Sequence, residues 1–147
     1  MSGRPIVLLL NGVNLDLLGE REPLIYGSET LDDHVKAATE AAEAAGFELE
    51  HLQSNHEGDL VEAVHGARDR CAAIVVNGAA FSHYAWGLHD ALASFEGPIV
   101  EVHISNPMSR ESWRRTSVLS PVATGIISGL GGHGYVLAIE WLRRRLG

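Results

Sequence analysis

The fold of this chain is decided by the stretch IVLLLNGVN, residues 6–14. Its first five residues are all apolar, which is typical of a strand in a parallel sheet that is covered on both faces. The polar residues that follow do not give way to a helical pattern until about Leu31. Because long connections in compact α/β domains are usually functional, we expect residues 11–27 to form an active-site loop.

Strand and helix patterns alternate along the rest of the chain. The strands are expected at residues 6–10, 47–52, 72–76, 98–102 and 124–128. The helices are expected at about residues 31–45, 59–70, 84–94 and 135–146. This alternation predicts one α/β domain over residues 1–147, a doubly wound five-stranded parallel sheet with right-handed crossovers. For a chain of this size we expect the flavodoxin-like strand order 2-1-3-4-5.

Polar residues at three strand ends predict where a ligand binds. The loops after the first, third and fourth strands begin at Asn11, Asn77 and His103. In doubly wound sheets, ligands bind outside the carboxyl ends of the strands, beside strand 1. A histidine in that position can be a general acid near neutral pH or a core residue with satisfied hydrogen bonds. Position alone leaves both interpretations of His103 open.

Composition narrows the possible partners and chemistry. The formal net charge of −8 disfavours nucleic acid or an anionic membrane surface, but it allows a small anionic ligand where arginines converge. No apolar run is long enough for a membrane helix and no signal segment opens the chain, so we expect a cytoplasmic protein. Lys36 is the only lysine and is expected on the surface, which disfavours chemistry through a lysine imine.

A glycine-rich stretch, GLGGHG at residues 129–134, matches the G-x-G-x-x-G pattern between a strand and a helix. A dinucleotide site needs a following strand with an acidic residue about 20 positions on, whereas this chain ends at Gly147. We therefore expect a tight turn with close backbone packing. A bound phosphate or flavin is the alternative.

Eight histidines raise the question of a metal site. Those near strand ends, His83, His89 and His103, match no zinc or iron spacing and have no carboxylate cluster beside them. We therefore expect no metal. The histidines expected on helix or loop surfaces are His34, His51, His56 and His65.

Arginines occur in two places where they could take part in catalysis or ligand binding. A tyrosine acts as a base only if its phenolate form is stabilised, and the guanidinium of Arg21 could do this for Tyr26; plain packing is the alternative. Arg110 and Arg114 are spaced to bind a carboxylate together, or to form surface ion pairs with Glu111. Position alone favours the ion pairs.

Four blocks, taken in order, resemble the type II 3-dehydroquinate dehydratases. They are NGVNLDLLG with REP and YG in residues 11–27, QSNHEG at 53–58, EVHISN at 101–106, and Arg110-Glu111 with Arg114. The resemblance extends over about residues 6–135 and beyond. It implies a flavodoxin-like fold and the conversion of 3-dehydroquinate to 3-dehydroshikimate by anti elimination of water through an enolate, without metal or cofactor. The shikimate pathway of aromatic amino acid biosynthesis and quinate catabolism share this step.

The resemblance also implies the roles of the catalytic residues. Tyr26 would remove the proton at C2, with Arg21 favouring its ionised form. Asn14 would hold the water that stabilises the enolate oxygen, as in an oxyanion hole. His103 would protonate the departing C1 hydroxyl. The residues implied to orient and support His103 are Asn77 and Glu101.

Substrate binding and assembly are implied in the same way. The substrate carboxylate would meet the Ser105 hydroxyl and the backbone N–H of Ile104. His83 and Arg114 would bind ring hydroxyls. Asp90 would reach the site of a neighbouring subunit, because the family assembles as trimers within dodecamers.

The chain departs from the family pattern at a few positions. Val13 stands where the signature loop usually has proline, and residues 78–89 include an unusual Phe81, Trp86 and His89. None of these changes removes a proposed catalytic group. The changes in residues 81–89 motivate one alternative, a paralogous dehydratase for a related cyclic hydroxy acid. A non-catalytic flavodoxin-like binding or assembly protein is a second alternative, favoured only if Tyr26 or His103 is misplaced.

Overall fold

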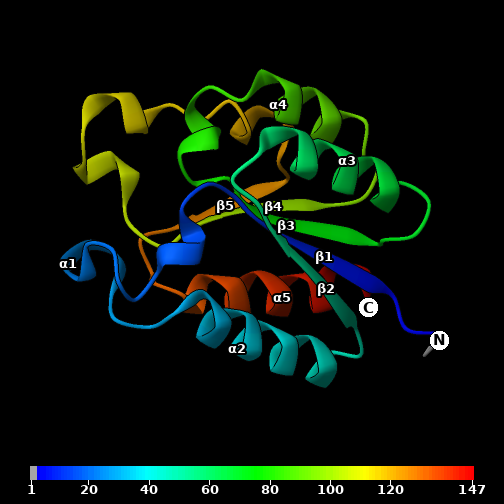
Figure 1. The fold of residues 1–147 in the computed structure, drawn as a ribbon. Coiled ribbons are helices and arrows are strands. Elements are labelled where there is room, and N and C mark those ends of the chain that lie inside the picture. The colour runs from blue at the N-terminus through cyan, green and yellow to red at the C-terminus, as the bar shows by residue number, and fades with distance from the viewer. Residues whose placement is uncertain (1–2) are drawn as a thin grey trace.

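The computed structural model describes residues 3–147, which form a five-stranded sheet with helices on both faces (Figure 1). The strands are β1 (Ile6–Asn11), β2 (Glu48–Gln53), β3 (Ala73–Asn77), β4 (Ile99–His103) and β5 (Gly125–Ser128). All neighbouring strands pair in parallel, in the order β2-β1-β3-β4-β5. The predicted fold class and strand order are therefore confirmed.

The helices sort into two layers. They are α1 (Pro23–Tyr26), α2 (Leu31–Ala44), α3 (Glu57–Ala67), α4 (Trp86–Ala93) and α5 (His133–Leu146). Helices α2 and α5 cover one face of the sheet, and α3 and α4 cover the other (Figure 1). No helix among residues 3–147 has the length and apolar character that crossing a membrane would require.

Strand β1 lies inside the sheet and is buried on both faces. Val7 and Leu9 pack into the core under α2 and α5, whereas Leu8 and Leu10 pack into the core under α3 and α4. This is why the run is apolar at every position, since successive side chains of a strand point to opposite faces. The edge strand β2 has no fully buried residue and alternates in sequence, as predicted.

The connection after β1 is more ordered than its polar sequence suggests. It holds a 3-10 helix, Leu15–Leu17, and the single helical turn α1. Leu15 and Leu18 are buried and fasten its first part to the core, whereas α1 has no buried residue. The next helix, α2, begins at a capping box, in which Thr30 and Asp33 exchange side-chain and backbone hydrogen bonds. The two parts of the connection thus differ in how firmly they are attached.

The glycine-rich stretch forms the tight turn between β5 and α5. Gly129 and Gly131 have φ values of 84° and 65°, a region that side chains disfavour. Gly132 lies against the ring of His34, so that a Cβ atom there would overlap the imidazole. The prediction that His34 lies on the surface is wrong. Its position three residues after Leu31 places it on the buried face of α2, where it is 5% exposed.

Replacing Gly132 with alanine should destabilise the protein, because the new methyl group has no room beside the buried His34. The expected loss is about 1–3 kcal/mol in the free energy of unfolding, typical of overpacking. Chemical denaturation would measure it. Gly66→Ala is the matched control, since nothing lies near its added Cβ in α3, and it should leave stability unchanged or raise it by up to about 1 kcal/mol. Equal stability of Gly132→Ala and wild type would contradict the packing argument.

Candidate active site

A cavity of about 180 Å³ lies where the loops after β1, β3 and β4 meet. Its lining residues are Val13, Asn14, Leu15, Arg21, Tyr26, Asn77, Ala79, Ala80, His83, His103, Ile104, Ser105, Pro107, Arg110 and Arg114. Parallel pairing places Asn11 beside Asn77, which brings the strand ends to one edge of the sheet. The site is therefore at the predicted carboxyl edge.

Close backbone contact fixes the two loops that form the inner wall of the cavity. The Gly12 N–H donates to the carbonyl of Asn77 at 2.8 Å, and a Cβ on Gly12 would overlap the carbonyl of Gly78. Asn14 has φ 67°, and its backbone N–H donates to the Asn55 side chain at 2.9 Å. Asn14 thus has a left-handed backbone conformation that costs free energy, and its hydrogen bond to Asn55, just after β2, holds it at the cavity.

The Asn77 amide is held by a buried hydrogen-bond chain. Its Nδ2 donates to the hydroxyl of Tyr135 at 2.9 Å, and that hydroxyl donates to Asn11 at 2.6 Å. The backbone N–H of Ala79 donates to Asn77 Oδ1 at 3.0 Å. Burial raises the pKa of Tyr135, so the phenol stays neutral and keeps its donor proton. The expected contact of Asn77 with His103 is not among these bonds and stays a prediction.

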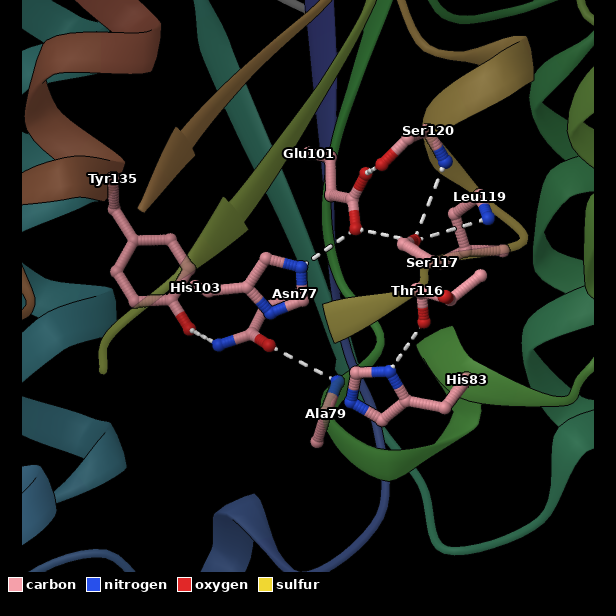
Figure 2. Close-up of polar contacts among 10 residues, drawn as sticks. All are labelled: Asn77, Ala79, His83, Glu101, His103, Thr116, Ser117, Leu119, Ser120 and Tyr135. Atoms are coloured by element: carbon pink, nitrogen blue, oxygen red, sulfur yellow. Dashed lines mark hydrogen bonds and ion pairs between the residues drawn. The ribbon is translucent and has the colours of Figure 1, made fainter. Parts of the chain in front are cut away.

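Glu101 is the hydrogen-bond partner of His103. Figure 2 shows its carboxylate between the imidazole and two serines, with Nε2 of His103 2.6 Å from Glu101 Oε2. Ser117 donates to Oε2 at 2.7 Å and Ser120 to Oε1 at 2.5 Å. Burial of Glu101 opposes ionisation, but the hydrogen bonds and the His103 charge outweigh it and hold the pKa of Glu101 below its ordinary value.

The ionised Glu101 decides which nitrogen of His103 serves the cavity. A carboxylate only accepts hydrogen bonds, so Nε2 must carry a proton. Nδ1 is then the nitrogen available to a ligand. In the doubly protonated ring, Nδ1 also carries a proton that it can donate to a ligand. The pair has the parts of a general acid.

Tyr26 contacts two arginines. Arg110 Nη1 donates to its hydroxyl at 2.7 Å and to Ser105 Oγ at 3.2 Å. The guanidinium carbon of Arg21 lies 4.9 Å from the ring centroid. The expected ion pairs with Glu111 do form, with Arg110 Nε 3.8 Å and Arg114 Nε 3.0 Å from its carboxylate. The Arg110 side chain is nevertheless only 11% exposed, because its Nη1 is directed to the phenol. The closer partner of the phenol is Arg110, which sequence reasoning missed.

On the outer side of the cavity, His83 and Arg114 are held by neighbouring groups. His83 Nδ1 lies 2.7 Å from the carbonyl of Thr116, which requires a proton on Nδ1 and leaves Nε2 as an acceptor in the neutral ring. Burial lowers the pKa of His83 and favours that neutral form, despite the opposing effect of the Thr116 bond. Arg114 donates to Glu111 at 3.0 Å and stacks over Trp113.

The structure brings most of the predicted site residues to one cavity. Glu101 lies behind His103 and does not line it. Asp90 is outside the cavity, on α4, with a side chain that is 85% exposed. Among residues 3–147 no cluster of three or more histidine, cysteine or carboxylate side chains is arranged to hold a metal ion.

Fold and site together define an α/β protein that carries the groups of an acid–base enzyme: a phenol beside two guanidinium groups shares a cavity with a glutamate-paired histidine. The comparison with known proteins narrows this class. The dehydroquinase class II family model matches residues 5–143, and the chain belongs to that family.

Relatives match along nearly the whole chain. A 3-dehydroquinate dehydratase of Bacillus licheniformis is 50% identical over 137 residues, which cover 93% of this chain and 94% of that protein. The 3-dehydroquinate dehydratase 2 of Pseudomonas putida is 48% identical over 137 residues, covering 93% and 92%. The crystal structure of a type II dehydroquinase from Butyrivibrio crossotus superposes with a TM-score of 0.92 at 40% identity, covering 95% and 97%.

Proposed function

We propose that the protein is a 3-dehydroquinate dehydratase, a hydro-lyase of the shikimate pathway that removes water through an enolate. Family membership and the activity named for its relatives support the reaction. The single observation that carries the mechanism is that Tyr26, hydrogen-bonded to Arg110, and His103, hydrogen-bonded to the Glu101 behind it, line one cavity. A base and an acid in one site are what the elimination of water requires.

The first step is removal of the proton at C2, next to the C3 ketone, by the phenolate of Tyr26. Arg110 donates to the phenolic oxygen, and Arg21 adds a second positive charge over the ring. Both interactions stabilise the phenolate more than the phenol, since they are stronger with an anion. The electron pair of the C–H bond moves toward the ketone oxygen, where a water held by Asn14 stabilises the enolate.

The second step is loss of the C1 hydroxyl. The enolate electron pair forms the C1–C2 double bond, the C1–O bond breaks, and His103 transfers its proton to the departing hydroxyl, which leaves as water. Glu101 stabilises the imidazolium before the transfer. A proton from solvent then restores His103, and Tyr26 gives up the proton taken from C2. The product is a conjugated enone.

Ligand contacts in this mechanism follow from the polar groups that line the cavity. The substrate carboxylate binds the hydroxyl of Ser105 and the backbone N–H of Ile104. The neutral His83 accepts a hydrogen bond from a ring hydroxyl through Nε2, because its Nδ1 proton is committed to Thr116. Arg114 donates to a second ring hydroxyl. A hydrogen-bond acceptor and a hydrogen-bond donor thus bind the ring hydroxyls, and this mechanism uses no cofactor or metal.

We also infer a cytoplasmic homo-oligomer built from trimers, in line with the family resemblance. Asp90 is the residue that would enter the site of a neighbouring subunit. Its exposed side chain on α4, outside its own cavity, supports that role. Analytical ultracentrifugation of the purified protein would measure the size of the assembly.

The test of the proposed function is turnover of 3-dehydroquinate by the purified protein, followed by the rise in absorbance of the conjugated enone. Turnover that persists after dialysis against a chelator would support the metal-free mechanism. Absence of turnover with 3-dehydroquinate, together with elimination from a related cyclic hydroxy acid, would support the paralogous dehydratase. No reaction with either class would favour a non-catalytic protein.

Borohydride should not inactivate the enzyme in the presence of substrate. Inactivation would need a lysine imine to reduce, and Lys36, the only lysine, is exposed on α2 and does not line the cavity. Residual activity after treatment and intact-mass spectrometry would measure this. Lys36→Arg is the control variant and should keep the wild-type rate. A mass increase at Lys36 with matching loss of activity would overturn the mechanism.

A further inference from the structure

The segment that follows the 3-10 helix Ser112–Arg115 places two serine hydroxyls on a buried carboxylate (Figure 2). Ser117 donates to one oxygen of Glu101 and Ser120 to the other, at 2.7 and 2.5 Å. Glu101 itself is fully buried on β4, which lies between β3 and β5. Together with His103, these serines are the hydrogen-bond partners that the structure gives the carboxylate.

We propose that Ser117 and Ser120 are positioning residues that keep Glu101 ionised, and thereby keep His103 charged as the acid of the reaction. This inference rests on the proposed function. Neither serine lines the cavity, so each acts on the substrate only through Glu101 and His103.

Burial of the Glu101 charge costs free energy. A carboxylate removed from water takes up a proton unless hydrogen bonds to its ionised form compensate for the lost hydration. A protonated Glu101 would no longer stabilise the His103 imidazolium. One hydroxyl on each oxygen, added to the imidazole, gives Glu101 three donors. Hydrogen bonds of this kind, with an ionised acceptor, are the strong ones.

The two serines differ in what else they hold. The Ser117 hydroxyl also accepts from the backbone N–H groups of Leu119 and Ser120, at 3.1 and 3.3 Å, so its removal would loosen the segment as well. The Ser120 hydroxyl makes its hydrogen bond to Glu101. Ser120→Ala is therefore the cleaner variant. Ser117→Ala provides a second, independent removal of a donor from the same carboxylate.

Other charged and titratable groups lie around Glu101 and His103. They are His83 beside the β3 end, Arg21 and Tyr26 from the first loop, Arg110 and Arg114 after β4, and Tyr135 from α5. His83 interacts electrostatically with both His103 and Glu101. All of them are present in wild type and in the serine variants, so a difference between the pH profiles reports the lost hydroxyl.

Ser120→Ala should lower kcat by roughly 10- to 150-fold, the size expected from losing one hydrogen bond to a charged group. Its kcat–pH profile should also narrow. With one hydrogen bond fewer to the carboxylate, His103 loses its acid proton at lower pH, so the alkaline limb of the profile shifts to lower pH. Glu101 takes up a proton at higher pH, so the acid limb shifts to higher pH. Ser120→Thr keeps the hydroxyl and should restore both the rate and the profile.

Ser82→Ala is the matched control, because Ser82 is also fully buried near the cavity but its hydroxyl has no hydrogen-bond partner among residues 3–147. It should leave the profile unchanged. In a Glu101→Gln background, Ser120→Ala should have little further effect on kcat, since the charge it supports is already gone. An undiminished effect in that background, or a profile of Ser120→Ala that coincides with wild type, would overturn the proposal.

Histidine 15N NMR reports the protonation of His103 without any turnover. The His103 signal of Ser120→Ala should titrate at lower pH than in wild type, and that of Ser82→Ala should not move. The turnover assay and the NMR titration together separate the proposed function from the role proposed for the serines. If wild type fails to dehydrate 3-dehydroquinate, the proposed function is wrong, yet the NMR shift still tests the serines. If wild type is active and the His103 titration is identical in Ser120→Ala, only the role of the serines is rejected.

Discussion

Tyr26→Phe is expected to reduce kcat for 3-dehydroquinate by about 10³-fold, within the 10²–10⁴ range that general acid–base groups contribute. The variant removes only the phenolic oxygen, which accepts the hydrogen bond from Arg110. KM should change much less than kcat, because the ring that packs beside Arg21 remains. Steady-state kinetics by enone absorbance would measure both parameters.

Tyr84→Phe is the matched control for this prediction. Tyr84 is 57% exposed, follows the 3-10 helix Ala79–His83, and does not line the cavity. Loss of its hydroxyl should leave kcat unchanged. Circular dichroism and thermal melting would show that Tyr26→Phe is folded. If the folded variant kept more than a tenth of the wild-type kcat, Tyr26 would not be the base.

The fold was predictable because its signals are local. Continuous apolar runs at β1 and β3 indicate buried parallel strands, and helical spacing with the capping box at Thr30 and Asp33 marks the start of α2. Strand ends and helix ends differ from the predicted bounds by a few residues. The polar residues Asn11, Asn77 and His103 then fall at one edge, since the sheet is parallel throughout.

The contacts of Arg110 were not predictable from position. The spacing of Arg110, Glu111 and Arg114 favours surface ion pairs, and both arginines do form one with Glu111. What turns Arg110 inward is the tyrosine 84 positions earlier in the chain, on a helical turn that sequence patterns did not indicate. The polar composition of the loop hid α1, and with it the place where Tyr26 meets Arg110.

The serines on Glu101 were missed for a similar reason. Ser117 and Ser120 are common loop residues, and their role depends on how the segment after the arginines folds back over β4. Glu101 gave the usable signal: an acidic residue inside an otherwise apolar strand must be compensated when buried. Searching the following loop for hydroxyl donors would have found them. His34 was placed wrongly because a polar residue was assumed to lie on the surface, although its spacing puts it on the buried face of α2.

His103→Gln is expected to lower kcat for dehydration by a factor comparable to that of Tyr26→Phe, about 10²–10⁴-fold, because the glutamine amide cannot donate a proton to the departing hydroxyl. Glutamine can still donate a hydrogen bond toward Glu101, which limits the loss of stability. His65→Gln is the control, since His65 is exposed on α3, away from the cavity, and its replacement should leave kcat unchanged.

Isotope exchange would separate the base from the acid. In the proposed order, Tyr26 removes the C2 proton before His103 assists loss of the C1 hydroxyl, so an enzyme without the acid still forms the enolate and returns it to substrate. Incubated in D2O, His103→Gln should incorporate deuterium at C2 of recovered 3-dehydroquinate much faster than it dehydrates it. Tyr26→Phe should do neither, because its enolate never forms. Mass spectrometry of the recovered substrate measures the exchange. If His103→Gln lost exchange and dehydration in equal proportion, proton removal would itself depend on His103. The assignment of Tyr26 as the base and His103 as the acid would then be wrong.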